Sequence, residues 1–361
     1  MDLLYKPDWE KVKERYKAWW NHEIVDRCCI SVTAPKGGVL KGNPPTRNNI
    51  EDLWTDFSYF HEINEYHHKH TFFGGEALPG WRPGKYPFTN SMAAFLGAPV
   101  DISERTGWVY PIIEKGELTD YNYSDLKIIP DNKWRLLEES AHHFAVEDSK
   151  GKCLPKLFAF ASSGDTLAAL RGTENLLLDL IDCPDYVRDF DQYLVKMYLG
   201  LFNSYYKIVG EASEGTCDWL NMWAPGKMYT IQNDFAYMLS PKMYNDIFLP
   251  SITMKTEFFD YAMYHVDGVG NFAHIDSLCE LPRLQAFQVY PGAGKGSALT
   301  YMNYLKKVQA AGKNLWIVLQ PDEIETALHE LSAKGLYIYT ECSSEEEAEY
   351  LLKNIVKWTK E

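Results

Sequence analysis

His265 and Asp267 stand two positions apart in the stretch AMYHVDG, after an apolar run and directly before a glycine. Side chains two positions apart on an extended strand point to the same face, so this imidazole and carboxylate are expected to share one. Cys342 has a similar place in TECSS, at the end of another apolar run. Nitrogen, oxygen and sulfur ligands of this kind bind zinc, and three protein ligands with one open position make a catalytic site. The alternative is a histidine–aspartate hydrogen bond that holds a loop, with the cysteine filling the core.

Two further carboxylates follow predicted strands. Asp234 in QNDF is a candidate catalytic residue, as a fourth metal ligand, general acid or substrate anchor; helix capping is an equal alternative because aspartate favours that position. Glu76 in GGEALPG is similarly placed and equally open, and it is a candidate substrate contact. Aromatic residues near strand ends are candidates to line a substrate pocket, with core packing as the alternative for each: Trp219, Trp223, Tyr264 and Tyr290.

The stretch HEINEYHHKH holds four of the ten histidines, at positions 61, 67, 68 and 70. It ends a long amphipathic pattern and leads into an apolar run. We interpret it as a solvated helix end followed by a strand, rather than as a metal site.

Eight short apolar runs, most of them separated by amphipathic segments, are candidates for the elements that position these residues. They lie at 28–35, 70–75, 156–164, 217–226, 262–268, 286–294, 314–321 and 335–344. Alternation of strand and helix eight times is typical of a (β/α)8 TIM barrel, whose reacting groups lie at the carboxyl ends of the strands. His265, Asp267 and Cys342 are at such ends, on the fifth and eighth predicted strands.

The chain is interpreted as one α/β barrel domain over 1–361. It has a helical extension at 1–27 and a long insertion at 76–130, after the second strand, that is expected to lie over the barrel mouth. Ser343 or Ser344 is expected to cap the last helix. Glu346 or Glu347, three positions further on, is expected to accept a hydrogen bond from the backbone N–H of the capping serine.

Bulk properties exclude several classes of protein. A net charge of −14 argues against nucleic-acid binding, which needs clustered Lys and Arg. No apolar run approaches the roughly 18–20 residues that span a bilayer, and the charged opening segment does not read as a secretory signal. Seven cysteines, an odd number, do not suggest a disulfide framework. A cytoplasmic protein with reduced thiols is expected.

Several phrases resemble the uroporphyrinogen decarboxylase superfamily, and most closely its branch of corrinoid-linked methyltransferases, which includes the methylcobalamin:coenzyme M methyltransferases. They are YHVDG, LQAFQVYPGAG and TECSSEEEAEYLL, with support from FFGGEALPG, LRGTENLLLDLIDCPDYV and QNDFAYMLSPKMYNDIFLP. The resemblance covers most of the chain and implies a (β/α)8 barrel, in agreement with the strand count.

The coenzyme M methyltransferases of this branch carry a zinc motif H-x-C, followed after a long gap by a second cysteine. His265 matches the motif histidine and Cys342 the last cysteine, with 74 residues between positions 267 and 342, whereas Asp267 stands where the first cysteine would be. A carboxylate in place of a thiolate makes zinc a harder Lewis acid. Sulfur-rich zinc suits a thiol acceptor, and harder zinc suits an oxygen or nitrogen leaving group.

The resemblance and this departure together imply the first step of a corrinoid pathway. A small O-methyl or N-methyl compound would lose its methyl group to the cobalt of a corrinoid (cobalamin) carried by a partner protein. Zinc at His265, Asp267 and Cys342 would stabilise the charge that develops on the leaving group.

Three alternatives remain: transfer from methylcobalamin to a thiol, decarboxylation of the uroporphyrinogen decarboxylase kind, and a non-catalytic barrel that binds small molecules. The decarboxylases need an early arginine-rich segment, whereas the matching VDRCCISVTAPKGG offers only Arg27. A polyacidic tetrapyrrole would also meet a strongly acidic protein. A corrinoid-binding protein and a small methylated substrate are the expected partners, and a homodimer is left open.

Overall fold

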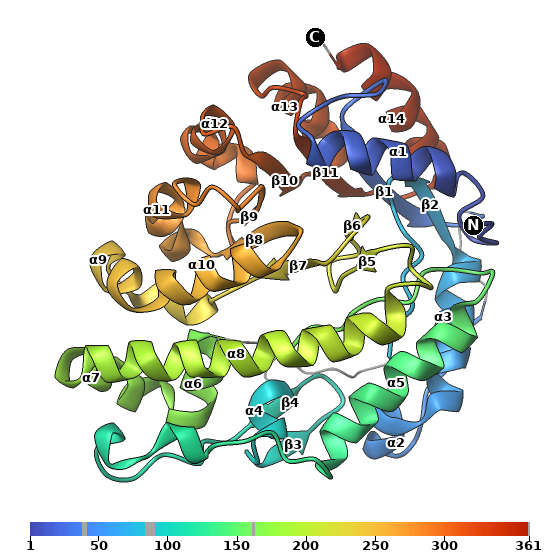
Figure 1. The fold of residues 1–361 in the computed structure, drawn as a ribbon. Coiled ribbons are helices and arrows are strands. Elements are labelled where there is room, and N and C mark those ends of the chain that lie inside the picture. Colours follow the sequence, from blue (N-terminus) through green and yellow to red (C-terminus); the bar gives the residue numbers. More distant parts are fainter. Residues whose placement is uncertain (38–41, 84–90, 161–162, 360–361) are drawn as a thin grey trace.

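The computed structural model describes residues 1–37, 42–83, 91–160 and 163–359, and it is built around a curved seven-stranded sheet (Figure 1). The strand order is β2-β1-β11-β10-β9-β8-β7, and every pairing is parallel except β1 with β2. The strands are β1 (Cys29–Pro35), β2 (Thr71–Gly75), β7 (Met228–Ile231), β8 (Tyr261–Asp267), β9 (Ala286–Tyr290), β10 (Asn314–Val318) and β11 (Leu336–Glu341).

Helices follow the strands in regular alternation from β7 to the carboxyl end of the described chain, and they lie along the outside of the sheet (Figure 1). They are α10 (Leu249–Phe258), α11 (Ile275–Cys279), α12 (Met302–Ala310), α13 (Ile324–Glu330) and α14 (Glu345–Trp358). The predicted α/β class is confirmed. Ser344 caps α14 by accepting a hydrogen bond from the N–H of Glu347 at 3.2 Å, as expected.

The part of the chain before β7 supplies further helices. These are α1 (Trp9–Trp20), α2 (Ile50–Thr55), α3 (Phe57–His70), α5 (Lys133–Ser149), α6 (Gly164–Arg171), α7 (Thr173–Asp182) and α8 (Pro184–Val209). A short α9 (Pro241–Met243) precedes α10. No helix in the described ranges is long and apolar enough to cross a membrane.

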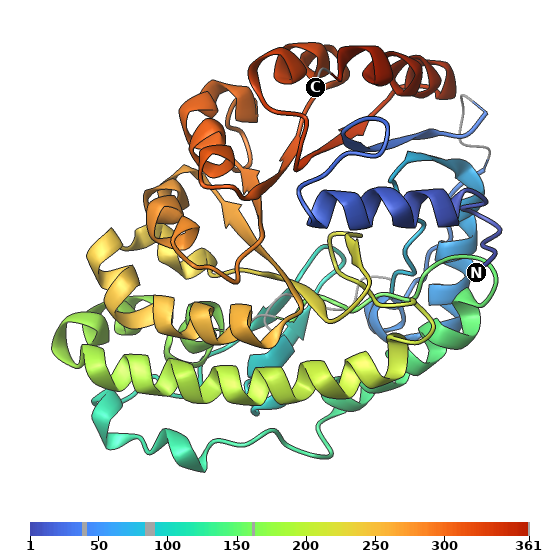
Figure 2. The ribbon, with the colours of Figure 1, turned by 45° about the horizontal axis from the view of Figure 1, so that its top comes forward.

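The strands are buried on both faces, which explains their nearly continuous apolar runs. Along β8, Tyr264 and Val266 belong to the outer core beneath the helices, whereas Met263 belongs to a separate inner core. That inner core also contains Trp9 and Trp19 of α1. Helix α1 therefore covers the amino-terminal end of the sheet's inner face, beside the short strand β6 (Figure 2).

Three predicted strands differ from the structure. The second, β2, runs antiparallel to β1, with Gly75 opposite Ser31. The third, at 156–164, is irregular over 156–160, and 161–162 lie outside the described residues. At 217–226 the chain forms a small antiparallel pair, β5 (Thr216–Cys217) and β6 (Trp223–Ala224), and the sheet strand is the following β7.

β2 and β7 are the two edge strands of the sheet. Among the described residues, the backbone that lies between these two edges is irregular. Trp81 donates a backbone hydrogen bond to Leu154 at 2.9 Å, and Leu157 donates one to Cys217 at 2.8 Å. Pro79 and Pro155 stand in these segments, and proline has no N–H for a strand ladder. A closed ladder of eight parallel strands is not seen in the described residues, so the complete barrel stays a prediction.

The described part of the 76–130 interval packs on the helices of the amino-terminal half. It contains α4 (Ser91–Phe95), β3 (Val100–Ile102) and β4 (Gly107–Val109), and α4 contacts α5 and α6. Tyr123 stacks on Phe190 of α8 at 5.1 Å between ring centroids. Residues 84–90 lie outside the described residues, and a position over the mouth stays a prediction.

Candidate metal centre and the adjoining cavity

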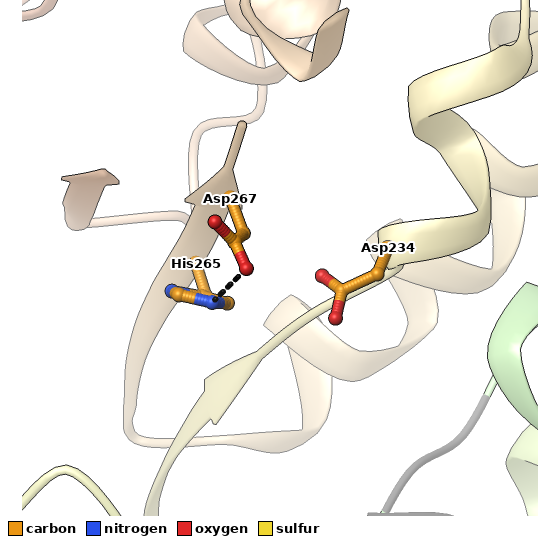
Figure 3. A group of neighbouring side chains, drawn as sticks. All are labelled: Asp234, His265 and Asp267. Atoms are coloured by element: carbon orange, nitrogen blue, oxygen red, sulfur yellow. Dashed lines mark ion pairs between the residues drawn. The ribbon is translucent and has the colours of Figure 1, made fainter. Parts of the chain in front are cut away.

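Three side chains meet at the carboxyl-terminal edge of the sheet: Asp234, His265 and Asp267 (Figure 3). Each offers one ligand atom, and these atoms all lie within 4.8 Å of one another. The Nε2 atom of His265 is 3.7 Å from Oδ2 of Asp267, two positions on along β8. Asp234 opens the short helix η3 (Asp234–Met238), which follows β7, the strand paired with β8. Neighbouring parallel strands thus bring the three groups together.

The His265 imidazole is oriented by a partner on the next strand. Its Nδ1 atom is hydrogen bonded to the side-chain oxygen of Gln288, which stands directly opposite on β9. An oxygen acceptor at Nδ1 keeps a ring proton there, so Nε2, beside the two carboxylates, is the atom that can bind a metal once it has lost its own proton. The Trp219 ring packs edge-on against the imidazole, 5.4 Å between centroids, and its Nε1–H donates to the carbonyl of Thr230. The His265 side chain is only 11% exposed.

The electrostatics of the cluster favour a cation. Burial tends to lower the pKa of His265, but hydrogen bonding to Asp267 and the charge of Asp234 outweigh it and raise this pKa. Burial and repulsion from Asp165 and Asp267 raise the pKa of Asp234 to about 7. The Asp234 side chain keeps access to solvent. A divalent ion would relieve this repulsion.

Two glycines allow η3 to come close to the end of β8. A Cβ atom on Gly268 would lie 2.9 Å from the Tyr237 ring, and one on Gly270 would lie 2.8 Å from the ring and carbonyl of Tyr237. Gly268 also has φ of +80°, which favours glycine. The glycines that follow HVD therefore permit the approach that brings Asp234 to His265 and Asp267.

Cys342 is not a member of this three-residue cluster. Cys342 directly follows the end of β11; it is buried with the outer core and also lines a cavity beside Tyr339 and Glu341. Its N–H donates to Thr33 at 2.8 Å, and burial, followed by the charge of Glu347, raises the pKa of its thiol to about 11. The described residues group Asp234, rather than Cys342, with His265 and Asp267.

The structure brings some of the predicted pocket residues to the cluster. Trp219 touches His265, and Tyr290 stands opposite Asp267 in the β8–β9 pairing. Tyr264 points to the other face of β8, where it is buried and its hydroxyl accepts a hydrogen bond from Tyr244 at 3.1 Å.

Glu76 and Trp223 lie in other surroundings. Glu76 is fully buried, and its carboxylate accepts two hydrogen bonds from the Arg27 guanidinium, at 2.7 and 2.9 Å. Trp223 is buried in the inner core, edge-on to Trp9 at 5.2 Å. Both have structural partners at these positions.

A cavity of about 350 Å³ lies at the carboxyl ends of β1 and β11, and none of its described lining residues belongs to the cluster. Its walls include Trp316 and Tyr339, together with His67, His70 and Arg82. The interpretation of the histidine run as a solvated helix end missed this role. Apart from Glu76, every predicted site residue is far from this run in the sequence. Only the return of α3 and β2 onto β1 shows that three of its imidazoles, those of His67, His68 and His70, line a cavity.

No protein-family model matches the chain, and no curated protein matches it. Among solved structures, its fold is similar to that of a methyltransferase from Methanosarcina mazei. The TM-score is 0.63 and the sequence identity 12%, over 96% of this chain and 98% of the other. At this identity the likeness establishes the fold.

Proposed function

We propose that the protein is a zinc-dependent methyltransferase that moves a methyl group from a small O-methyl or N-methyl compound to the cobalt of a corrinoid on a partner protein. The observation that carries the proposal is the cluster of Asp234, His265 and Asp267 at the carboxyl-terminal edge of the sheet. Active sites of α/β sheets and barrels lie at this edge. The overall likeness to a methyltransferase and the sequence resemblance point the same way.

The donor set suits zinc. One imidazole nitrogen and two carboxylate oxygens are ligands that catalytic zinc sites use, and they leave a position open. Hydrogen bonding of Nδ1 to Gln288 presents Nε2 as the ligand atom of His265. Zinc, when bound, supplies Lewis acidity to the oxygen or nitrogen from which the methyl group departs.

The chain's own residues hold and shape this site. The backbone of β8 fixes His265 and Asp267, and Trp219 shields the imidazole on one side. Asp234, whose pKa lies near 7, can hold a proton in the metal-free protein and releases it when a cation binds. The methyl carbon passes to cobalt while its former oxygen or nitrogen keeps the bonding electron pair and takes up a proton from solvent.

Transfer to a thiol is the less favoured direction. A sulfur-rich zinc site suits thiol activation, whereas the grouped ligand atoms are one nitrogen and two oxygens. No contact in the described residues favours this second function, so the demethylating direction is the one we put to the test.

Metal analysis of the purified protein and an assay with cobalt(I) cobalamin test the proposal. We expect about one zinc per chain and methylcobalamin formation from at least one of methoxylated aromatics, methylamines or methanol. Asp267→Ala should abolish both, whereas Asp322→Ala, an exposed aspartate after β10 at the same edge of the sheet, should change neither. A protein that takes up no zinc, or that methylates only added thiols, would contradict the proposal.

A further inference from the structure

Arg82 lies among other basic side chains at the cavity. Its backbone is held against α3 by Asn64, whose side-chain oxygen accepts a hydrogen bond from the Arg82 N–H at 2.7 Å and whose side-chain nitrogen donates one to the Arg82 carbonyl. Asn64 is one helical turn before His67 and His68, and these two residues line the cavity with Arg82. The Arg82 side chain is exposed, and it forms no ion pair with a carboxylate among the described residues.

The charge of Arg82 acts on the basic groups around it. Burial is the largest cause of a lowered pKa at His67, and the charge of Arg82 adds to it. Burial and the Arg82 charge also lower the pKa of His68 to about 4 and that of Lys156, in the irregular segment before α6, to about 8. Lys156 therefore stays mainly protonated at pH 7, as Arg82 does. Like charges that face one space repel each other, and a bound anion relieves this repulsion.

The lining of the cavity is rich in hydrogen-bond donors and poor in negative charge. The Lys156 ammonium donates to the side-chain oxygen of Asn221 at 3.1 Å, which leaves the amide nitrogen of Asn221, a lining residue, as the donor for a ligand. Glu341 is the one acidic residue among the described lining residues; it is exposed, and its carboxylate accepts a hydrogen bond from the Tyr339 hydroxyl at 2.6 Å. In a protein with a net charge of −14, this basic wall is a local exception that attracts an anion.

We propose that this cavity binds the phosphate group of a small phosphate monoester, with its oxygens on the Arg82 guanidinium and the Asn221 amide nitrogen. A phosphate monoester carries nearly two negative charges at pH 7 and strong acceptor oxygens, which match two positive groups and a wall of donors, whereas a carboxylate carries one charge. A volume of about 350 Å³ is at the small end of ligand pockets and leaves room for a small organic group beside the phosphate. None of the described lining residues belongs to the metal cluster, so the inference goes beyond the proposed function and does not depend on it.

Isothermal titration of the chelator-treated protein tests the inference, because removal of metal keeps phosphate from binding at the candidate metal centre. Glycerol 2-phosphate, inorganic phosphate and acetate are compared at pH 7 and one ionic strength. We expect the ester to bind at least about tenfold more tightly than acetate and no more weakly than inorganic phosphate. Arg82→Gln should weaken binding of the ester about tenfold or more, since a charge-assisted hydrogen bond is lost, and Arg82→Lys, which keeps the charge, should weaken it less.

Arg105 is the matched control for Arg82. It is exposed on the β3–β4 hairpin and, like Arg82, forms no ion pair with a carboxylate in the described part of the chain. Arg105→Gln should bind the ester within about twofold of the wild type, because its charge is far from the lining of the cavity in the sequence and is not part of that lining.

Three results would overturn the inference: no binding of the ester by the wild type, equal binding of the ester by the wild type and Arg82→Gln, or acetate that binds as tightly as the ester. Tighter binding of inorganic phosphate than of the ester would overturn the monoester and assign the cavity to free phosphate. These measurements use neither metal nor corrinoid, so the phosphate site can fail while methyl transfer to cobalt is observed, and the reverse.

Discussion

The Oδ1 atom of Asp165 accepts a hydrogen bond from the backbone N–H of Phe235 at 2.8 Å, which puts a carboxylate directly behind Asp234. The other oxygen of Asp165 is buried, and the buried Lys255 contributes an opposing charge. His265 and Asp267 stand on a strand, but Asp234 stands on a short turn of helix. Asp165 therefore holds this turn in place through its hydrogen bond with Phe235 and acts as a positioning residue for Asp234.

The first prediction concerns this contact. Asp165→Ala should lower zinc affinity about 10- to 100-fold, the usual effect of removing a group that orients a ligand. Asp165→Asn, which keeps an oxygen acceptor, should recover much of it. Chelator competition measures the affinity, and the visible absorption of the Co²⁺-loaded protein reports the coordination geometry.

Asp191 provides the matched control for Asp165. It is fully buried and also faces Lys255, but its hydrogen bond comes from the Ser163 hydroxyl, at 3.0 Å, and not from the Asp234 turn. Asp191→Asn should leave zinc affinity within about threefold of the wild type. If Asp165→Ala and Asp191→Asn weakened the metal equally, the effect would belong to the buried charges in general and not to positioning.

The second prediction concerns the glycine after Asp267. Gly268 and Gly294 have similar left-handed backbones, with φ of +80° and +73°, but only Gly268 is crowded, by the Tyr237 ring. Gly294→Ala should cost about 1 kcal/mol for backbone strain. Gly268→Ala should cost a further 1–3 kcal/mol, roughly, because the added methyl group displaces η3. Urea unfolding measures the free energy of unfolding of both variants. Equal losses would show that the close approach of η3 to Gly268 does not add to the cost of the substitution.

Much of the fold from β8 to α14 follows from local sequence signals. The apolar runs at 262–268, 286–294, 314–321 and 335–344 match β8 to β11, with β8 beginning one residue before its run, and the serine–glutamate pattern at 343–347 marks the start of α14. The strands were predictable because each is buried on both faces, and α14 because Ser344 gives it a start signal. The pairing of His265 with Asp267 follows from the two-residue period of the same strand.

The remaining features depend on long-range pairing that no local pattern encodes. Asp234 joins the cluster because β7 pairs with β8 and because two glycines admit η3. Cys342 lies outside the cluster because it follows β11, which β10 and β9 separate from β8, and the sequence motif does not reveal this separation. The irregular backbone around Pro79 and Pro155 has apolar composition but too few N–H groups in register for a ladder.

The third prediction concerns acid stability. His142 is fully buried between the rings of Phe158 and Tyr205, at 4.0 and 4.5 Å between centroids, and burial lowers its pKa to about 3. The unfolded chain takes up this proton near pH 6.5 and the folded chain does not, so stability should fall as pH drops from about 6.5 toward 3. His142→Phe should reduce the slope by up to about 1.4 kcal/mol per pH unit.

Urea unfolding at pH 7, 5.5 and 4.5 measures this slope. His143→Phe, on the solvent face of the same helix, is the control and should leave the slope as in the wild type, because that side chain is solvated in both states. A His142→Phe variant with an unchanged slope would show that this imidazole is not a source of the acid sensitivity.

The fourth prediction decides which residue is the third ligand. Asp234→Ala and Cys342→Ser each remove one candidate: Asp234 has a ligand atom within 4.8 Å of those of His265 and Asp267, and Cys342 matches the sequence motif. We expect Asp234→Ala to lower zinc affinity at least about 100-fold, because two ligands hold the ion far more weakly than three. Cys342→Ser should bind zinc within about threefold of the wild type, since the Cys342 thiol, with a pKa raised to about 11, is protonated and lies at the end of β11, which β10 and β9 separate from β8. The reverse order of affinities, with a sulfur-to-metal charge-transfer band in the Co²⁺-loaded wild type that disappears in Cys342→Ser, would place the cysteine in the metal site and require the end of β11 to turn inward when the ion binds.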